Sequence, residues 1–246
     1  MFDHVTIRAS DRGASESFYA TVLHTLGIEQ THSGEHYAEW DDFSLGQADA
    51  LHPPTRRLHI GFVAPSPAHV DEFWRVGVEA GYENDGEPGP RPQYTEDYYG
   101  AFLLDRDGNS AEAVHHGSTR EGGNVDHLWI RVSDVDASTR FYETVGPAAG
   151  FRVGRELADR TLFACVSGSF SVVGGDQPTE HVHLAFAASD NETVDQFHRE
   201  ATAAGYRDNG APGERTIYHA GYYGAFVLDP DGNNVEVVNH NRRGRG

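Results

Sequence analysis

Apolar and polar residues alternate at the start of the chain and then change to a helical spacing. The segment "HVTIRAS" (4–10) alternates in the manner of a half-buried strand. The following segment, "DRGASESFYATVLHTLG" (11–27), places Phe18, Val22 and Leu26 on one helical face and ends at Gly27. The pattern therefore predicts a strand followed by a helix.

A second unit of the same kind begins at "RLHIGFVAP" (57–65). Its predicted helix, "SPAHVDEFWRVGVEAG" (66–81), has Ser66 as a candidate N-cap and Gly81 as its stop. Strands are expected after it, interrupted by "NDGEPGPRP" (84–92) and joined through a tight turn in "LDRDGN" (104–109). Each unit thus reads as strand, helix and then several strands.

The second half of the chain repeats the first. "FDHVTIRASD" (2–11) aligns with "VDHLWIRVSD" (125–134), and "YYGAFLLDRDGNSAE" (98–112) aligns with "YYGAFVLDPDGNNVE" (222–236). This period is far longer than that of solenoid repeats, so each half is predicted to be a small domain. We expect domains at 1–118 and 124–246, with the boundary in the glycine-rich "HHGSTREGGN" (115–124). Four strand–helix–strand–strand–strand modules with mixed sheets make an α+β fold.

Composition narrows the class of partner. The formal net charge of −19 argues against a general nucleic-acid or anionic-membrane surface, both of which need basic footprints, and favours a small-molecule partner. No apolar run is long enough to span a membrane and the N-terminus lacks the pattern of a signal peptide, so a cytoplasmic protein is expected. The single Cys165 excludes an internal disulfide framework and a cysteine-rich zinc site.

Each half carries two histidines and one glutamate in predicted strands. The first half has His4, His59 and Glu112, and the second has His127, His183 and Glu236. A carboxylate buried in a sheet without partners costs several kcal/mol, and a divalent cation would compensate it. Two imidazoles and one carboxylate are also the donor set of open metal sites that leave positions for substrate and dioxygen.

At these positions the chain resembles the vicinal oxygen chelate superfamily, which includes glyoxalase I, extradiol dioxygenases, fosfomycin-modifying transferases, an epimerase and metal-free bleomycin-binding proteins. The resemblance lies in "DHVTIRASD", "LHIGF", "YYGAF" and "DGN..E" with their second copies, and it covers almost the whole chain. It implies tandem domains of paired βαβββ modules that curl around cavities. It also implies metal ligands at the first, fifth and last strands, which are the six residues named above.

Differences between this sequence and the patterns of individual enzyme groups make some reactions a better match than others. Glyoxalase I usually has a further glutamate in the strand before the fifth, but "DDFSLGQADA" (41–50) offers only Asp41 and Asp42, and "SGSFSVVGG" (167–175) offers no acid. A fosfomycin transferase should bring lysines, and the chain has none. The extradiol signature is better matched, by His219 and "DPDGNNVE" (229–236), although Phe226 stands where that signature has a tyrosine.

The first expectation is therefore extradiol-type dioxygenation of a small catecholic substrate. The resemblance implies a ferrous ion at His127, His183 and Glu236, with Mn(II), Ni(II) or Zn(II) as alternative metals. His219 is the candidate acid–base group. The remaining candidates are Tyr223 as a second catalytic group, and Arg215, Tyr222, Arg91 and Tyr98 as substrate contacts.

Two other functions and one geometric choice stay open. The metal could act as a Lewis acid in a redox-neutral isomerase, epimerase or lyase, or the chain could be a resistance-type protein that binds an aromatic compound on Trp40, Trp129 and its tyrosines. Ligand sets could form within a half, as in His4, His59 and Glu112, or be exchanged, as in His4 with His183 and Glu236. A monomer is expected, with a homodimer as the alternative.

Overall fold

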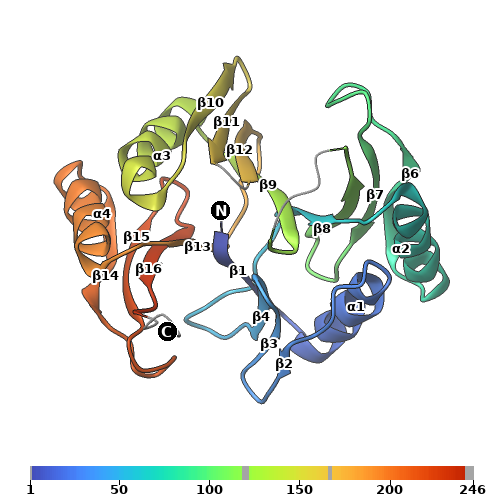
Figure 1. Ribbon diagram of the computed structural model, residues 1–246, viewed down its shortest axis with the longest axis horizontal. Helices are drawn as coiled ribbons and strands as arrows, with labels where there is room; N and C mark the ends of the chain where they lie inside the picture. Colours follow the sequence, from blue (N-terminus) through green and yellow to red (C-terminus); the bar gives the residue numbers. More distant parts are fainter. Residues whose placement is uncertain (1, 118–121, 166–167, 242–246) are drawn as a thin grey trace, which may run out of the picture.

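The computed structural model describes residues 2–117, 122–165 and 168–241, and confirms the α+β fold of four modules (Figure 1). Residues 118–121, within the predicted domain boundary, lie outside the described residues. Module 1 contains β1 (Phe2–Ala9), α1 (Arg12–His24), β2 (His32–Ser33), β3 (Tyr37–Trp40) and β4 (Phe43–Gln47). Module 2 contains β5 (His59–Val63), α2 (Pro67–Glu79), β6 (Glu83–Pro90), β7 (Tyr99–Leu104) and β8 (Ser110–His115). Module 3 contains β9 (Val125–Val132), α3 (Val135–Ala149), β10 (Arg152–Leu157), β11 (Arg160–Cys165) and β12 (Gly168–Gly174). Module 4 contains β13 (His183–Ala187), α4 (Asn191–Ala203), β14 (Arg207–Glu214), β15 (Tyr223–Leu228) and β16 (Asn234–Asn239).

The modules pair across the two halves of the sequence. One eight-stranded sheet has the order β14-β15-β16-β13-β1-β4-β3-β2 and joins modules 1 and 4, while the other, β10-β11-β12-β9-β5-β8-β7-β6, joins modules 2 and 3. The joints are the antiparallel pairs β1–β13 and β5–β9. Each sheet therefore takes half of its strands from each copy of the duplication.

The helices follow the predicted periodicity. Phe18 and Val22 of α1 are buried, and Asp11 caps this helix by accepting a hydrogen bond from the Ala14 N–H. Ser66 occupies the N-cap position of α2 as predicted, but its hydroxyl pairs with His69 Nδ1 at 2.8 Å instead of capping the backbone. None of the described helices is long and apolar enough to cross a membrane.

The predicted break at residues 84–92 is wrong, because β6 runs through most of it. β6 pairs with β7 in an irregular register with shifts at Asn84/Gly86 and Gly86/Gly89. As the last strand of its sheet, β6 needs no ladder partner on one side, so it tolerates prolines that an inner strand would not.

An aromatic core lies between the helices and the sheets. In the first half Tyr19, Trp40 and Phe43 are fully buried and pack together, with ring centroids 4.7 Å apart for Tyr19 and Phe43. Trp40 is 0% exposed, so it stabilises the fold and is not available to stack on a ligand. That corrects its assignment as a ligand-binding residue.

We predict that the two halves, expressed as separate fragments cut near the boundary, assemble into a one-to-one complex. The first-half fragment alone would leave β1 and β5 without their native antiparallel neighbours, and the second-half fragment would leave β13 and β9 without theirs. Co-expression with an affinity tag on one fragment should recover both, and size-exclusion chromatography should give the mass of the whole chain. Two fragments that elute separately as folded monomers would contradict the cross-half pairing.

Candidate functional site

The six candidate ligands come together in two groups, each drawn from both halves. Site A consists of His59, Glu112 and His127, and site B consists of His4, His183 and Glu236. Within each group the donor atoms all lie within 4.8 Å of one another. The structure therefore forms the exchanged sets, and it does not bring together the sets within one half.

Strand register explains why these side chains meet. In site A, Gly61 of β5 is opposite His127 of β9 on one side and Glu112 of β8 on the other. His59 precedes Gly61 by two residues and so lies on the same face of the sheet. Because the joint between β5 and β9 belongs to both halves, a histidine of the second half completes a site of the first.

Site B repeats this arrangement. Ala185 of β13 is opposite both His4 of β1 and Glu236 of β16, and His183 precedes it by two residues. The ring centroids of His4 and His183 are 5.2 Å apart, close to the 5.4 Å between His59 and His127 in site A.

One carboxylate oxygen in site A faces both imidazoles. Glu112 Oε2 lies 2.8 Å from His59 Nε2 and 3.2 Å from His127 Nε2. The other oxygen, Oε1, accepts a 2.7 Å hydrogen bond from the Tyr98 hydroxyl. Glu112 is only 1% exposed, so these three contacts replace the water that the carboxylate has lost.

Site B has the same contacts with one looser distance. Glu236 Oε2 lies 2.9 Å from His183 Nε2 but 3.7 Å from His4 Nε2. The Tyr222 hydroxyl donates to Glu236 Oε1 at 2.6 Å. Glu236 is 0% exposed and is therefore buried as deeply as its counterpart.

The charges in site A support one another. Burial raises the pKa of Glu112, but the hydrogen bonds and positive charge of His127 and His59 outweigh burial and lower the pKa to about 2. Burial lowers the pKa of His127, but hydrogen bonds to Asp126 and Glu112 dominate and raise that pKa to about 9. The raised pKa of His127 favours its protonated imidazole, which places positive charge beside the carboxylate.

An aspartate orients one histidine in each site. Asp126 Oδ2 lies 2.8 Å from His127 Nδ1, and Asp3 Oδ1 lies 2.9 Å from His4 Nδ1. Because Nδ1 is engaged, each ring presents Nε2 to the glutamate, an arrangement common around metal-bound histidines. We did not predict a role for these aspartates, although the dipeptide "DH" recurs at the start of both first strands and was the available signal.

The candidate acid–base residue His219 lies at the end of a hydrogen-bonded chain behind site B. Its Nε2 is 2.8 Å from His240 Nδ1, and His240 Nε2 is 2.8 Å from Asp3 Oδ2. Asp3 then holds His4. His219 is thus connected to His4 through two residues, and its ring also meets the Tyr222 ring edge-on, with 5.4 Å between centroids.

The two sites differ at one small residue. Gly61 lies under the His127 ring so closely that a Cβ atom built on it would be 2.5 Å from His127 Cε1. The corresponding residue in site B is Ala185, which does carry a Cβ atom and faces His4. Site B, which has this methyl group, is also the site with the longer distance from histidine to glutamate, 3.7 Å between His4 Nε2 and Glu236 Oε2.

The tyrosine candidates separate into two kinds. Tyr98 and Tyr222 direct their hydroxyls at the glutamates, as described above. Tyr223 does not reach site B, because its hydroxyl donates to Asp195 of α4 at 2.8 Å, on the helix-covered face of the sheet.

The two arginine candidates are each held by the edge strand that precedes them, β6 for Arg91 and β14 for Arg215. Arg91 donates to the Glu87 carbonyl at 2.8 Å, and its guanidinium lies 5.4 Å from the centre of the Phe102 ring. Arg215 donates to the Ala211 carbonyl at 2.6 Å and lies 5.5 Å from the Phe226 ring centre. The aromatic ring at the position of the extradiol tyrosine therefore stacks on an arginine.

No further carboxylate reaches either site from the strand before the fifth. β4 and β12 contain no acidic residue. Asp42, which precedes β4, accepts the backbone N–H groups of Asn124 and Val125 at 2.9 and 3.2 Å. Each group of described residues thus offers three protein donors.

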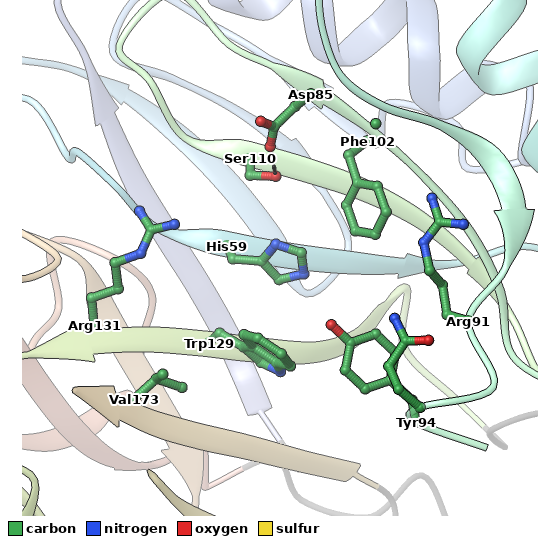
Figure 2. Close-up of a pocket in the computed structure, with 11 residues that line it drawn as sticks. His59, Asp85, Arg91, Tyr94, Phe102, Ser110, Trp129, Arg131 and Val173 are labelled. Atoms are coloured by element: carbon green, nitrogen blue, oxygen red, sulfur yellow. Dashed lines mark hydrogen bonds between the residues drawn. The ribbon is translucent and has the colours of Figure 1, made fainter. Parts of the chain in front are cut away.

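A cavity of about 530 Å³ opens beside site A. His59 lines it, and Figure 2 shows this imidazole between Trp129 and Phe102, with Arg131 and Arg91 at opposite sides. The volume is typical of a small-molecule site. A ligand in this cavity would contact a metal-ligating candidate directly.

Comparison with known proteins agrees with this architecture. The profile of the Glyoxalase/Bleomycin resistance protein/Dioxygenase superfamily matches residues 1–113 and 124–237. Glyoxalase I from Zea mays superposes with a TM-score of 0.71 at 16% identity, covering 97% of this chain and 92% of the other, which shows a shared fold.

Other solved structures are less similar as a whole. A glyoxalase/bleomycin resistance protein from Albidiferax ferrireducens is 28% identical over 46% of this chain and 96% of its own, with a TM-score of 0.41. The Mn(II)-bound glyoxalase from Novosphingobium aromaticivorans is 20% identical, covers 97% of this chain and 81% of its own, and has a TM-score of 0.42. A comparison with curated proteins gives no match. With both halves matched by the family profile and two His-His-Glu groups built between them, the chain belongs to the Glyoxalase/Bleomycin resistance protein/Dioxygenase superfamily.

Proposed function

We propose that the protein is a divalent-metal-dependent enzyme acting on a small molecule with two adjacent oxygen atoms. The observation that carries this proposal is the pair of buried glutamates, each facing two imidazoles across strands of both halves. Both ligand sets are complete within one chain, which supports the expectation of a monomer.

The donor spacing suits an ion. Two ligand atoms that each lie about 2.1 Å from a metal, at a right angle to each other, are about 3 Å apart. The distances from the glutamate oxygen to the imidazole nitrogens are 2.8 and 3.2 Å in site A and 2.9 and 3.7 Å in site B. An ion would replace these contacts with small shifts of the same side chains.

The surrounding residues would hold the donors in place. Asp126 and Asp3 fix the rings of His127 and His4 through Nδ1, and a tyrosine hydroxyl fixes the outer oxygen of each glutamate. A bound metal would supply Lewis acidity and open positions for two substrate oxygens, and a ferrous ion would also accept dioxygen.

Extradiol-type dioxygenation is the first candidate reaction. With three protein donors, a six-coordinate ion keeps three positions for substrate and dioxygen, and the aromatic walls of the cavity suit a catecholic ring. Fe(II) is the metal we favour on this basis.

A redox-neutral Lewis-acid reaction, as in isomerases, epimerases or lyases, is the second candidate. The observation that favours it is the placement of His219, which lies behind His4 and is bonded to His240. Its other ring nitrogen, Nδ1, lies 2.9 Å from the Ala220 carbonyl oxygen, so both nitrogens of the imidazole assigned to dioxygen chemistry are engaged within the protein. Such a reaction would need a metal but no dioxygen.

We predict that iron-loaded protein, purified without a histidine tag, consumes dioxygen with catechols and contains two ions per chain. Glu112→Gln and Glu236→Gln, made separately, should each lower the metal content to one ion and should identify the working site by a loss of activity of about 100-fold or more. An oxygen electrode and elemental analysis measure both effects. Turnover without dioxygen, with any divalent ion, would favour the Lewis-acid reaction, and ligand binding that is unaffected by a chelator would favour a binding protein.

We predict that Tyr222→Phe weakens metal binding at site B by about tenfold, because it removes the donor that orients Glu236. The matched control is Tyr223→Phe, which removes a hydroxyl of the neighbouring residue that bonds to Asp195 instead. Competition with a fluorescent chelator measures both affinities. Equal effects of the two substitutions would show that the tyrosine near Glu236 has no orienting role.

We predict that Gly61→Ala weakens metal binding at site A by about tenfold or more, since its methyl group would displace the His127 ring. Ala185→Gly should strengthen metal binding at site B, because it lets His4 approach Glu236. Metal titration of each variant, with thermal unfolding as a control for stability, tests the pair. Unchanged affinities in both would remove the steric explanation for the difference between the sites.

A further inference from the structure

The cavity beside site A has aromatic walls on several sides. The ring centroid of His59 is 5.6 Å from that of Trp129 and 5.7 Å from that of Phe102. Tyr94 meets Trp129 edge-on, with 5.6 Å between centroids. Figure 2 shows these rings around one hollow, and such walls suit a planar ring.

Two arginines extend from the same face of the sheet at the edge of this cavity. Val173 of β12 pairs with Arg131 of β9 on one side and with Arg160 of β11 on the other. Residues directly opposite in neighbouring strands share a face, so both side chains lie on the face of Val173, with backbones roughly 10 Å apart. Trp129 precedes Arg131 by two residues and lies on this face as well.

Neither guanidinium has an acidic partner among the described residues. No hydrogen bond or ion pair of the Arg131 or Arg160 side chain is present in residues 2–117, 122–165 and 168–241, although the protein has 38 acidic residues. Arg160 rests over the Trp129 ring, 5.5 Å from its centre. Arg131 lines the cavity and Arg160 lies against its Trp129 wall, so two cations without an acidic partner among the described residues lie at one aromatic cavity in a protein of net charge −19.

Arg160 and Arg91 both lie close enough to act on Tyr94, which lines the same cavity. Burial and the Glu112 carboxylate raise the pKa of the Tyr94 hydroxyl, while the Arg160 and Arg91 guanidinium groups act in the opposite direction. Among the described residues that line the cavity, the one acidic side chain is Asp85, which accepts a 2.6 Å hydrogen bond from the Ser110 hydroxyl. Figure 2 places Asp85 and Ser110 on the side of His59 opposite to Trp129.

The corresponding positions near site B are different. Gly46 stands in place of Val173, opposite Arg8 and Tyr37, so the row contains one arginine instead of two. Arg8 donates to the Gln47 carbonyl at 3.2 Å. Thr6 replaces Trp129, and its hydroxyl bonds to Ser44 at 2.7 Å. Of the two sites, site A is therefore the one that combines an indole with two arginines lacking an acidic partner in the described part of the chain.

We propose that the cavity beside site A recognises an aromatic carboxylate, with its ring on Trp129 and its acidic group between Arg131 and Arg160. The part of this inference that concerns substrate oxygens on a metal rests on the proposed function, whereas the contacts of the ring and the carboxylate do not. A carboxylate placed there would gain charge-assisted hydrogen bonds that the free protein lacks.

Protocatechuate and catechol are suitable probes, because they share a ring with adjacent hydroxyls and differ in one carboxylate. Calorimetric titration of chelator-treated and iron-loaded protein should show protocatechuate binding at least about tenfold tighter than catechol in both forms. The preference should shrink at high salt, because the paired charges are partly exposed. Equal affinity of the two probes would overturn the proposal.

Variants locate the effect. Arg131→Met with Arg160→Met should abolish the preference for the carboxylate, and the single Arg131→Gln should reduce it, while Arg8→Met at site B should leave it unchanged. Trp129→Leu should weaken both probes about equally. Circular dichroism controls for folding. A preference that survives the double substitution, or that Arg8→Met removes, would overturn the proposal.

The same experiment separates this inference from the proposed function. A carboxylate preference in chelator-treated protein together with no metal-dependent turnover would retain the ligand class and reject the enzyme. Metal-dependent turnover of catechols without any preference for the carboxylate would do the reverse.

Discussion

A buried carboxylate is the constraint on which the architecture around each centre depends. Glu112 and Glu236 have almost no contact with solvent, and each must be compensated by groups that other strands deliver. A charge in such surroundings is tolerated only with several good partners. The tyrosine comes from the adjacent hairpin, one histidine from the neighbouring parallel strand, and the second histidine from the other half of the sequence. The groups that neutralise each glutamate are therefore all in place only when its sheet is complete.

Much of the fold could be predicted from the sequence because its signals are local. Alternation, helical spacing and glycine stops marked the first strand and the first helix of each module, and the duplication marked the modules themselves. The edge strand β6 was missed, because proline and glycine normally end a strand and only its place in the sheet makes them acceptable. The burial of Trp40 was also missed, since an indole in a short strand gives no sign of which face it occupies.

The candidate ligands were predictable as residues but not as sets. His4, His59 and Glu112 are equivalent in sequence to His127, His183 and Glu236, so either pairing of modules would use the same six side chains. The choice depends on which first strands become neighbours, a long-range contact that leaves no local pattern. The placement of His219 could not be predicted either, because its partner His240 follows the last strand and belongs to none of the repeated motifs.

Exchange of strands between the halves has a consequence for how the duplicated sequence can diverge. Site A takes two donors from the first half and one from the second, and site B takes one from the first and two from the second. Loss of the ligands of either half would therefore disrupt both sites. Neither half can lose its metal-ligating residues while the other half keeps a complete site. The residues around the two sites have diverged more than the ligands, since Thr6 occupies the strand position of Trp129 and Gly46 that of Val173. A chain built in this way can keep two similar centres and still offer them to different molecules.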